Sequence, residues 1–196
     1  MLRNCLFAAF SAAIVLLSSI TAAAVDHKGI ASPNLKDGYF TLVENGVPTP
    51  IIVDDSDLEG VKIAARTLRE DFGRVCGATP NIGSDAKWER AIIIGSPESK
   101  IIGQLAKEGK IDISSIKGQW ETYIITDVQN PLPGIKDALV IAGSDKRGTI
   151  YGIYELSELM GVSPWYDWAD VPVERHKDMS IRRGFWTVGE PAVKYR

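Results

Sequence analysis

The sequence predicts an α/β domain built on a mixed sheet with flanking helices. Short apolar runs rich in β-branched residues, typical of buried strands, alternate with stretches whose apolar residues recur every three or four positions, as in amphipathic helices. In addition, a proline-rich turn at residues 130–134 separates two strand-like runs, which predicts an antiparallel pair. We expect this domain to span residues 37–183.

The N-terminus differs from the rest of the 196-residue chain. Arg3 precedes an apolar run from residue 6 to 17, and small residues ending at Ala24 follow it. This pattern predicts a secretory signal peptide over residues 1–24, and therefore a secreted, extracellular protein. A membrane anchor is the alternative, but the run is short and no cationic cluster follows it. Residues 25–36 are polar and mixed and predict a loose lead-in.

Composition excludes several classes of function. Apolar residues make up 45% of the chain and charged residues 24%, as in soluble globular proteins. Without Arg3 the mature chain has 21 basic and 25 acidic residues, a net charge of −4, and its scattered cations predict no nucleic-acid partner. Cys76 is the one cysteine left after the signal, so no disulfide is expected. His27 and His176 are isolated, so neither a metal site nor a cofactor is expected.

The first half of the domain is expected to begin with a hairpin. Strands at 39–43 and 51–53 are joined around a turn at 44–46, and Pro48 and Pro50 place the pair at a sheet edge. The acidic run 54–57 supplies cap candidates for the next helix. That amphipathic helix has apolar positions from Leu58 to Val75 and closes at Gly77.

The second half repeats the strand and helix pattern. A buried strand at 91–94 leads to a helix that starts at Ser96-Pro97-Glu98 and ends by Gly109. A strand at 120–126 then pairs with a strand at 138–142 across the proline-rich turn. Ser144 or Asp145 caps the following helix, whose apolar positions recur from Thr149 and which stops at Gly161, and a last strand covers 179–181.

The tight turn from Gly143 to Thr149 is the first candidate site. A helix begins there, so backbone N–H groups and the cations Lys146 and Arg147 converge, which suits a carboxylate or another anion. The glycine spacing is that of a phosphate loop, but Thr149 follows the second glycine where lysine is needed, which disfavours nucleotide binding. Alternatively, the two glycines only permit a tight turn and both cations are solvated.

The aromatic segment 165–168 is the second candidate. Trp165, Tyr166 and Trp168 surround Asp167, and indole and phenol faces are surfaces on which sugar rings stack. The alternative is that these rings pack the loop onto the core or against a neighbouring domain. No carboxylate pair is persuasive for glycosidic hydrolysis. The acids of run 54–57 are better explained as helix-start residues, and the pair Glu155 and Glu158 as a solvated helix face.

Two long stretches of the sequence resemble a known family. Residues 140–158, which include Ser144 to Thr149, and residues 161–173, which include the aromatic segment, look like the N-terminal region of glycoside hydrolase family 115. That family comprises secreted xylan α-1,2-glucuronidases. The resemblance implies removal of glucuronic acid, or its 4-O-methyl ether, from xylan by an inverting mechanism. Asp167 stands where the family is expected to have an aromatic residue.

The resemblance also implies which domain of such a protein performs catalysis. The family's catalytic acid and base lie on a (β/α)-barrel downstream of the N-terminal domain, so the chain is expected to be a non-catalytic N-terminal fragment of a multidomain glycoside hydrolase, inactive alone. Residues 184–196 then open the missing barrel, and no catalytic residue can be assigned. The expected partners are that barrel and glucuronoxylan, with no membrane. Candidate substrate-binding residues are Asp145, Lys146, Arg147, Trp165 and Trp168.

Two other functions remain open at this point. The chain could be an independent secreted carbohydrate-binding module that uses Trp165 and Trp168 as its platform. It could also be an extracellular binder of small anions with no link to glycans. Binding of glucuronoxylan by the chain alone would favour the carbohydrate-binding module over the supporting domain.

Overall fold

The computed structural model describes residues 29–85 and 88–191. The signal peptide expected over residues 1–24 lies outside the described residues. Within them, no helix is both long enough and apolar enough to cross a membrane.

The larger of two sheets is the mixed sheet that the sequence predicts. Its strands are β4 (Ile51–Val53), β5 (Ile82–Gly83), β6 (Arg90–Gly95), β7 (Tyr123–Gln129), β8 (Asp137–Gly143) and β10 (Phe185–Val188). Their order is β10-β7-β8-β6-β4-β5, in which β8, β6, β4 and β5 are parallel. Strand β7 is antiparallel to β8 across the proline-rich turn, which confirms that predicted pair, and β10 is antiparallel to β7.

A second, antiparallel sheet was not predicted. It consists of β1 (Ala31–Ser32), β2 (Tyr39–Glu44), β3 (Val47–Pro48) and β9 (Met179–Arg182), in the order β1-β9-β2-β3. Strand β1 lies within residues 25–36, so this part of the expected lead-in is ordered by pairing with β9. The two partners of β9 lie about 140 residues earlier in the chain, a separation that no local pattern signals.

The expected hairpin is only half right. Asn45 and Gly46 have positive φ angles of 52° and 77°, as a two-residue type I′ turn requires, and they join β2 to β3. Pro48 lies in the edge strand, as expected. The pairing of 39–43 with 51–53 is wrong, because β4 lies in the larger sheet between β5 and β6. All three β4 residues are buried, which suits an interior parallel strand.

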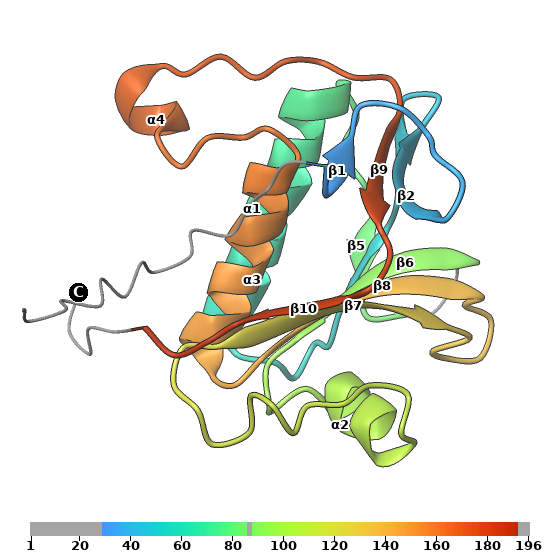
Figure 1. Ribbon diagram of the computed structural model, residues 1–196, viewed down its shortest axis with the longest axis vertical. Helices are drawn as coiled ribbons and strands as arrows, with labels where there is room; N and C mark the ends of the chain where they lie inside the picture. The colour runs from blue at the N-terminus through green and yellow to red at the C-terminus, as the bar shows by residue number, and fades with distance from the viewer. Residues whose placement is uncertain (1–28, 86–87, 192–196) are drawn as a thin grey trace, which may run out of the picture.

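Four helices complete the described fold: α1 (Glu59–Cys76), α2 (Lys100–Lys107), α3 (Lys146–Leu159) and α4 (Tyr166–Ala169). Helices α1 and α3 lie side by side on one face of the larger sheet, and α2 lies on the other (Figure 1). Gly77 and Gly161, with φ angles of 81° and 92°, follow the ends of α1 and α3, which confirms both predicted stops.

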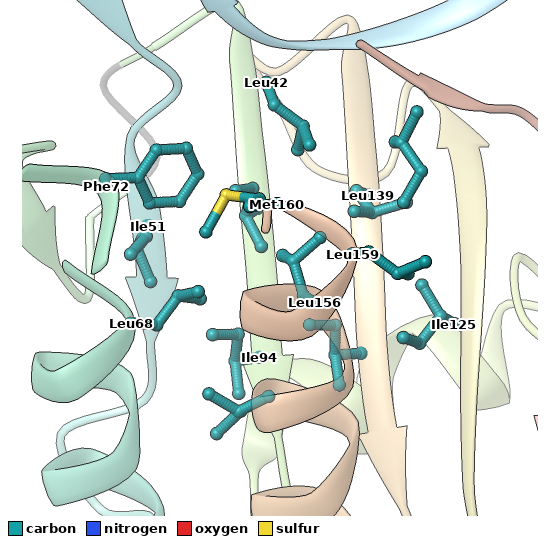
Figure 2. Packing of buried hydrophobic residues seen from close by; sticks show 14 of the residues in the cluster. Leu42, Ile51, Leu68, Phe72, Ile94, Ile125, Leu139, Leu156, Leu159 and Met160 are labelled. Carbon is teal, nitrogen blue, oxygen red and sulfur yellow. The ribbon is translucent and has the colours of Figure 1, made fainter. Parts of the chain in front are cut away.

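The core follows the period of two along the strands. In register across β4, β6 and β8, the side chains of Ile51, Ile92 and Leu139 face α1 and α3, and their neighbours one residue along face α2. Figure 2 shows Phe72 of α1 near Met160, which follows α3, within this first cluster. Because the smaller sheet contributes to the same cluster, one core joins both sheets to the helix pair.

The acidic run 54–57 does not cap α1. Leu58 occupies the N-cap position and makes no side-chain capping bond. Instead Asp57 accepts a hydrogen bond from the Ser96 N–H (2.9 Å), and Asp54 accepts one from the Lys100 N–H (2.7 Å) at the start of α2. Helix α2 therefore begins at Lys100 with Ser99 as its N-cap, and not at Ser96 as predicted. The carboxylates tie the end of β4 to the turn after β6.

Asp54 predicts a pH dependence of stability. Burial opposes its ionisation, but hydrogen bonds from Ser56 and from the Lys100 N–H outweigh burial and lower the pKa of Asp54. A lowered folded-state pKa contributes stability above the unfolded-state pKa, and this contribution is lost as pH falls through the folded-state value. Asp54→Asn should cost about 1 kcal/mol at pH 7 and lose less further stability than wild type at about pH 3. Urea unfolding at both pH values checks this, and equal losses would contradict it.

Residues 184–196 were assigned to the opening of a following domain, yet Phe185–Val188 form β10 of the larger sheet. The preceding residues hold this strand in place. Arg183 donates to both Asp127 (3.0 Å) and Asp137 (2.7 Å), and the Gly184 N–H donates to Asp127 (2.7 Å). The hydrogen bond and charge of Asp137 raise the pKa of Arg183, although burial opposes the shift.

Candidate functional site

The side chains of the turn before α3 form hydrogen bonds with backbone N–H groups of the protein itself. Asp145 is the N-cap of α3, and its carboxylate accepts hydrogen bonds from the Gly148 N–H (2.7 Å) and the Glu121 N–H (2.9 Å). The Ser144 hydroxyl accepts from the Thr122 N–H (3.0 Å). The helix start therefore holds a negative charge that the chain supplies itself, and binding of a ligand anion there stays a prediction.

Both cations of this turn contact neighbouring parts of the chain. Arg147 donates to Glu121 (2.6 Å), whose side chain is 1% exposed, and this hydrogen bond together with the Glu121 charge raises the pKa of Arg147. The Lys146 side chain lies against Gly60, where an added Cβ would be 3.3 Å from its Cδ. This arrangement favours the structural alternative for the turn. A contact of Asp145, Lys146 or Arg147 with substrate stays a prediction.

The aromatic segment has two faces. Trp165 is 65% exposed and Trp168 is 85% exposed, so neither indole packs the loop onto the described core. Tyr166 lies between them in sequence at the start of the short helix α4, and it is half-buried against the core cluster. Only Tyr166 therefore follows the packing alternative, and both indoles lie on the surface of the described part of the chain.

A relay of contacts, from Ser157 of α3 through Asp71 and Arg74 of α1 to Tyr166, connects this segment to both helices. Asp71 of α1 is buried, accepts a hydrogen bond from the Ser157 hydroxyl of α3 (2.6 Å), and forms a short ion pair with Arg74. The Arg74 guanidinium in turn lies over the Tyr166 ring, 4.6 Å from its centre. Despite desolvation, the hydrogen bond to Asp71 raises the pKa of Arg74. Helices α1 and α3 therefore position Tyr166, and with it the segment that carries Trp165 and Trp168.

A cleft of about 950 Å³ opens beside this relay. Its walls come from α1, α3, the start of β7, the residues around α4 and the chain just after β10. Aromatic residues and carboxylates dominate the lining, which includes Asp71, Arg74, Glu121, Tyr123, Tyr151, Tyr154, Glu155, Glu158, Tyr166, Asp167 and Glu190. Its volume and its aromatic and polar lining give this cleft the character of a ligand site.

The charge of the cleft affects Tyr123. Burial, followed by the nearby negative charges of Glu155 and Glu158, raises the pKa of Tyr123, so its phenol stays protonated. Glu155 and Glu158, which the sequence predicts to be a solvated helix face, both line the cleft. No group of three or more potential metal ligands occurs in residues 29–85 and 88–191.

Sequence reasoning missed most of this cleft. Among its lining segments, the sequence predicts only the aromatic segment as a candidate site. A weak signal did exist, since Tyr151, Tyr154, Glu155 and Glu158 recur every three or four residues on one face of α3. Nothing local connects that face to Arg74 or to the end of β10, and these contacts define the site.

Comparison with solved structures finds a glycoside hydrolase that is similar to this chain. It matches a family GH115 4-O-methyl-alpha-glucuronidase with specificity for decorated arabinogalactans, with a TM-score of 0.65 and 33% identity over 80% of this chain and 19% of that one. Weaker matches include CpGH84D (TM-score 0.43, 11% identity, 73% of this chain and 21% of that one) and an N-acetyl-beta-hexosaminidase of Streptomyces plicatus (TM-score 0.47, 12% identity, 83% and 25%).

No family model and no curated protein matches the sequence. The chain spans about a fifth of the length of the glucuronidase and a fifth to a quarter of the other two structures. The chain is therefore related in sequence and structure to one region of a family GH115 glycoside hydrolase.

Proposed function

We propose that this chain is the non-catalytic N-terminal domain of a secreted family 115 glycoside hydrolase that removes glucuronic acid, or its 4-O-methyl ether, from xylan. The observation that supports this most is the 33% identity to about a fifth of a GH115 glucuronidase, over 80% of this chain. The signal-like residues 1–24 support secretion. Catalysis is then the task of the other four fifths of such a polypeptide.

The hydrogen-bond partners of four carboxylates favour a structural role for this chain. Asp54, Asp57, Asp71 and Asp145 each accept at least two hydrogen bonds from the chain itself. A catalytic acid or base in a glycosidase must instead present its carboxyl group to the glycosidic oxygen or to water. These acids are engaged in joining strands and helices, so the function we assign to them is structural.

A domain exchange tests the proposal. The region of the GH115 glucuronidase that matches this chain would be replaced by residues 29–191, and the chimera assayed on glucuronoxylan and on decorated arabinogalactan. We expect a folded chimera that releases 4-O-methylglucuronic acid, because the supporting fold is conserved in shape. A soluble chimera without activity, or one that fails to fold under conditions where the parent folds, would overturn the proposal.

An independent carbohydrate-binding module remains the second candidate. The observation that favours it is the exposure of Trp165 and Trp168, at 65% and 85%. Large exposed aromatic surfaces usually mark contacts with a ligand or a partner. Under this candidate the chain binds polysaccharide without any catalytic region, and the domain exchange would yield an inactive chimera.

A further inference from the structure

The aromatic side chains of the cleft present flat surfaces to a ligand. Tyr154 is 47% exposed, and the half-buried residues Tyr151 and Tyr166 also line the cleft. The apolar faces of sugar rings pack on such surfaces, while sugar hydroxyls and phenol groups exchange hydrogen bonds. Pro164 and Asp167, from the same segment as Trp165 and Trp168, extend the lining toward the exposed tryptophans.

The charge of the cleft decides which sugars fit. Carboxylates of α1, α3, the α4 segment and the chain around β7 and β10 line it, and among the described lining residues Arg74 is the one cation. That cation is paired with Asp71. The lining is therefore net negative, so a ligand carboxylate that enters it is repelled. Carboxylate oxygens accept hydrogen bonds from hydroxyl groups and so can hold a neutral sugar.

We propose that this cleft binds uncharged sugar residues of a polysaccharide main chain and disfavours uronic acids. The inference rests on the proposed function in one respect, which is that a glycan-active polypeptide makes a glycan the expected ligand class. It separates two tasks within such a polypeptide: the cleft holds neutral rings of the main chain, and the acidic side group is bound elsewhere. The turn at Asp145 to Arg147 is not needed for this binding.

A cationic peptide is the other ligand that an acidic, tyrosine-lined cleft suggests. At least three of the lining carboxylates already have donors from the chain: Asp71 has Arg74, Glu121 has Arg147, and Glu190 has the Trp120 N–H (2.8 Å). The charges of Asp71 and Glu121 are thus balanced before any ligand arrives. The remaining carboxylates of the lining still repel a uronate, and the tyrosine rings offer the flat stacking surface that a sugar ring uses, which favours a neutral ring over a basic side chain.

The full chain is titrated with four kinds of ligand, and binding is monitored by calorimetry and by tryptophan fluorescence. Neutral xylo-oligosaccharides and neutral galacto-oligosaccharides distinguish the two possible main chains. A xylo-oligosaccharide that bears 4-O-methylglucuronic acid and an oligolysine peptide are the charged arms. We expect a Kd of about 0.1–1 mM for one neutral series and roughly fivefold weaker binding of the uronate at low salt. That difference should shrink in about 0.5 M salt because of screening.

Variants localise the binding. Tyr154→Ala should weaken neutral-sugar binding about tenfold. The double variant Glu158→Gln, Asp167→Asn should reduce the difference in Kd between the neutral and the uronate-bearing oligosaccharide. Val47→Ala, at an exposed apolar residue in the edge strand β3, is the control and should change neither. No binding of either neutral series, equal or tighter binding of the uronate, or binding of oligolysine alone would overturn the inference. None of these results affects the domain exchange, so the two proposals fail separately.

Discussion

Replacing Gly148 with alanine is expected to lower the free energy of unfolding by about 3 kcal/mol. Gly148 lies in the first turn of α3, where the helix passes close to the chain just before β7. A Cβ at this position would lie 2.9 Å from the carbonyl carbon of Thr122 and closer still to its oxygen. Both partners are backbone, so neither can move aside as a flexible side chain would. Urea unfolding, monitored by fluorescence and circular dichroism, measures the loss.

A matched control is available in α2. Gly103 is also a helical glycine, but an added Cβ would meet nothing within 4 Å. Gly103→Ala should therefore stabilise the protein by about 0.5–1 kcal/mol through helix propensity. If Gly148→Ala had the same small effect as Gly103→Ala, α3 could not lie against Thr122 as described. The expected contrast also explains the phosphate-loop-like glycine spacing, since a close approach of backbone to backbone accounts for Gly148 without a nucleotide.

Removing the carboxylate of Asp71 is the second large effect. We expect Asp71→Ala to cost about 2–3 kcal/mol, because it breaks a buried ion pair with Arg74 and leaves the Ser157 hydroxyl without its acceptor. The cost stays below that of a fully buried pair because the Arg74 side chain is 28% exposed and reaches water. Denaturant unfolding of the variant and wild type gives the difference directly.

Glu70→Ala supplies the comparison for this change. Glu70 is the neighbouring acid on α1 and is exposed, so its loss should alter stability by no more than about 0.5 kcal/mol. Arg74→Gln should cost less than Asp71→Ala, yet it should still weaken sugar binding, because the guanidinium over Tyr166 is lost. Equal stability of Asp71→Ala and Glu70→Ala would mean that Asp71 does not join α1 to α3.

Local patterns predicted most of the larger sheet and the helices that cover it. Apolar runs marked β6 and β8, the three- and four-residue spacing marked α1, and Gly77 and Gly161 marked helix ends, because each of these signals is contained within a few residues. The smaller sheet was not predictable in this way. Its strands β1 and β9 are short and meet across about 150 positions, so only the folded core selects their pairing.

The candidate site was predictable only at its edge. Aromatic composition alone nominated Trp165 and Trp168, and their exposure is consistent with a contact surface. The relay from Asp71 through Arg74 to Tyr166 joins two segments about 90 residues apart, and no spacing rule connects them. The same holds for the acidic run 54–57. The sequence predicts that these acids cap α1, but Asp57 and Asp54 accept hydrogen bonds from the Ser96 and Lys100 N–H groups, before and at the start of α2.

The proposed function requires that this chain supports catalysis without performing it. The most direct measurement is the release of glucuronic acid from glucuronoxylan, and from decorated arabinogalactan, by the purified chain at high concentration over a long incubation. We expect no release above the rate without protein, since Asp54, Asp57, Asp71 and Asp145 are bonded to the chain and the carboxylates of the cleft repel uronate. Turnover that persists after repurification and scales with the amount of chain would contradict it.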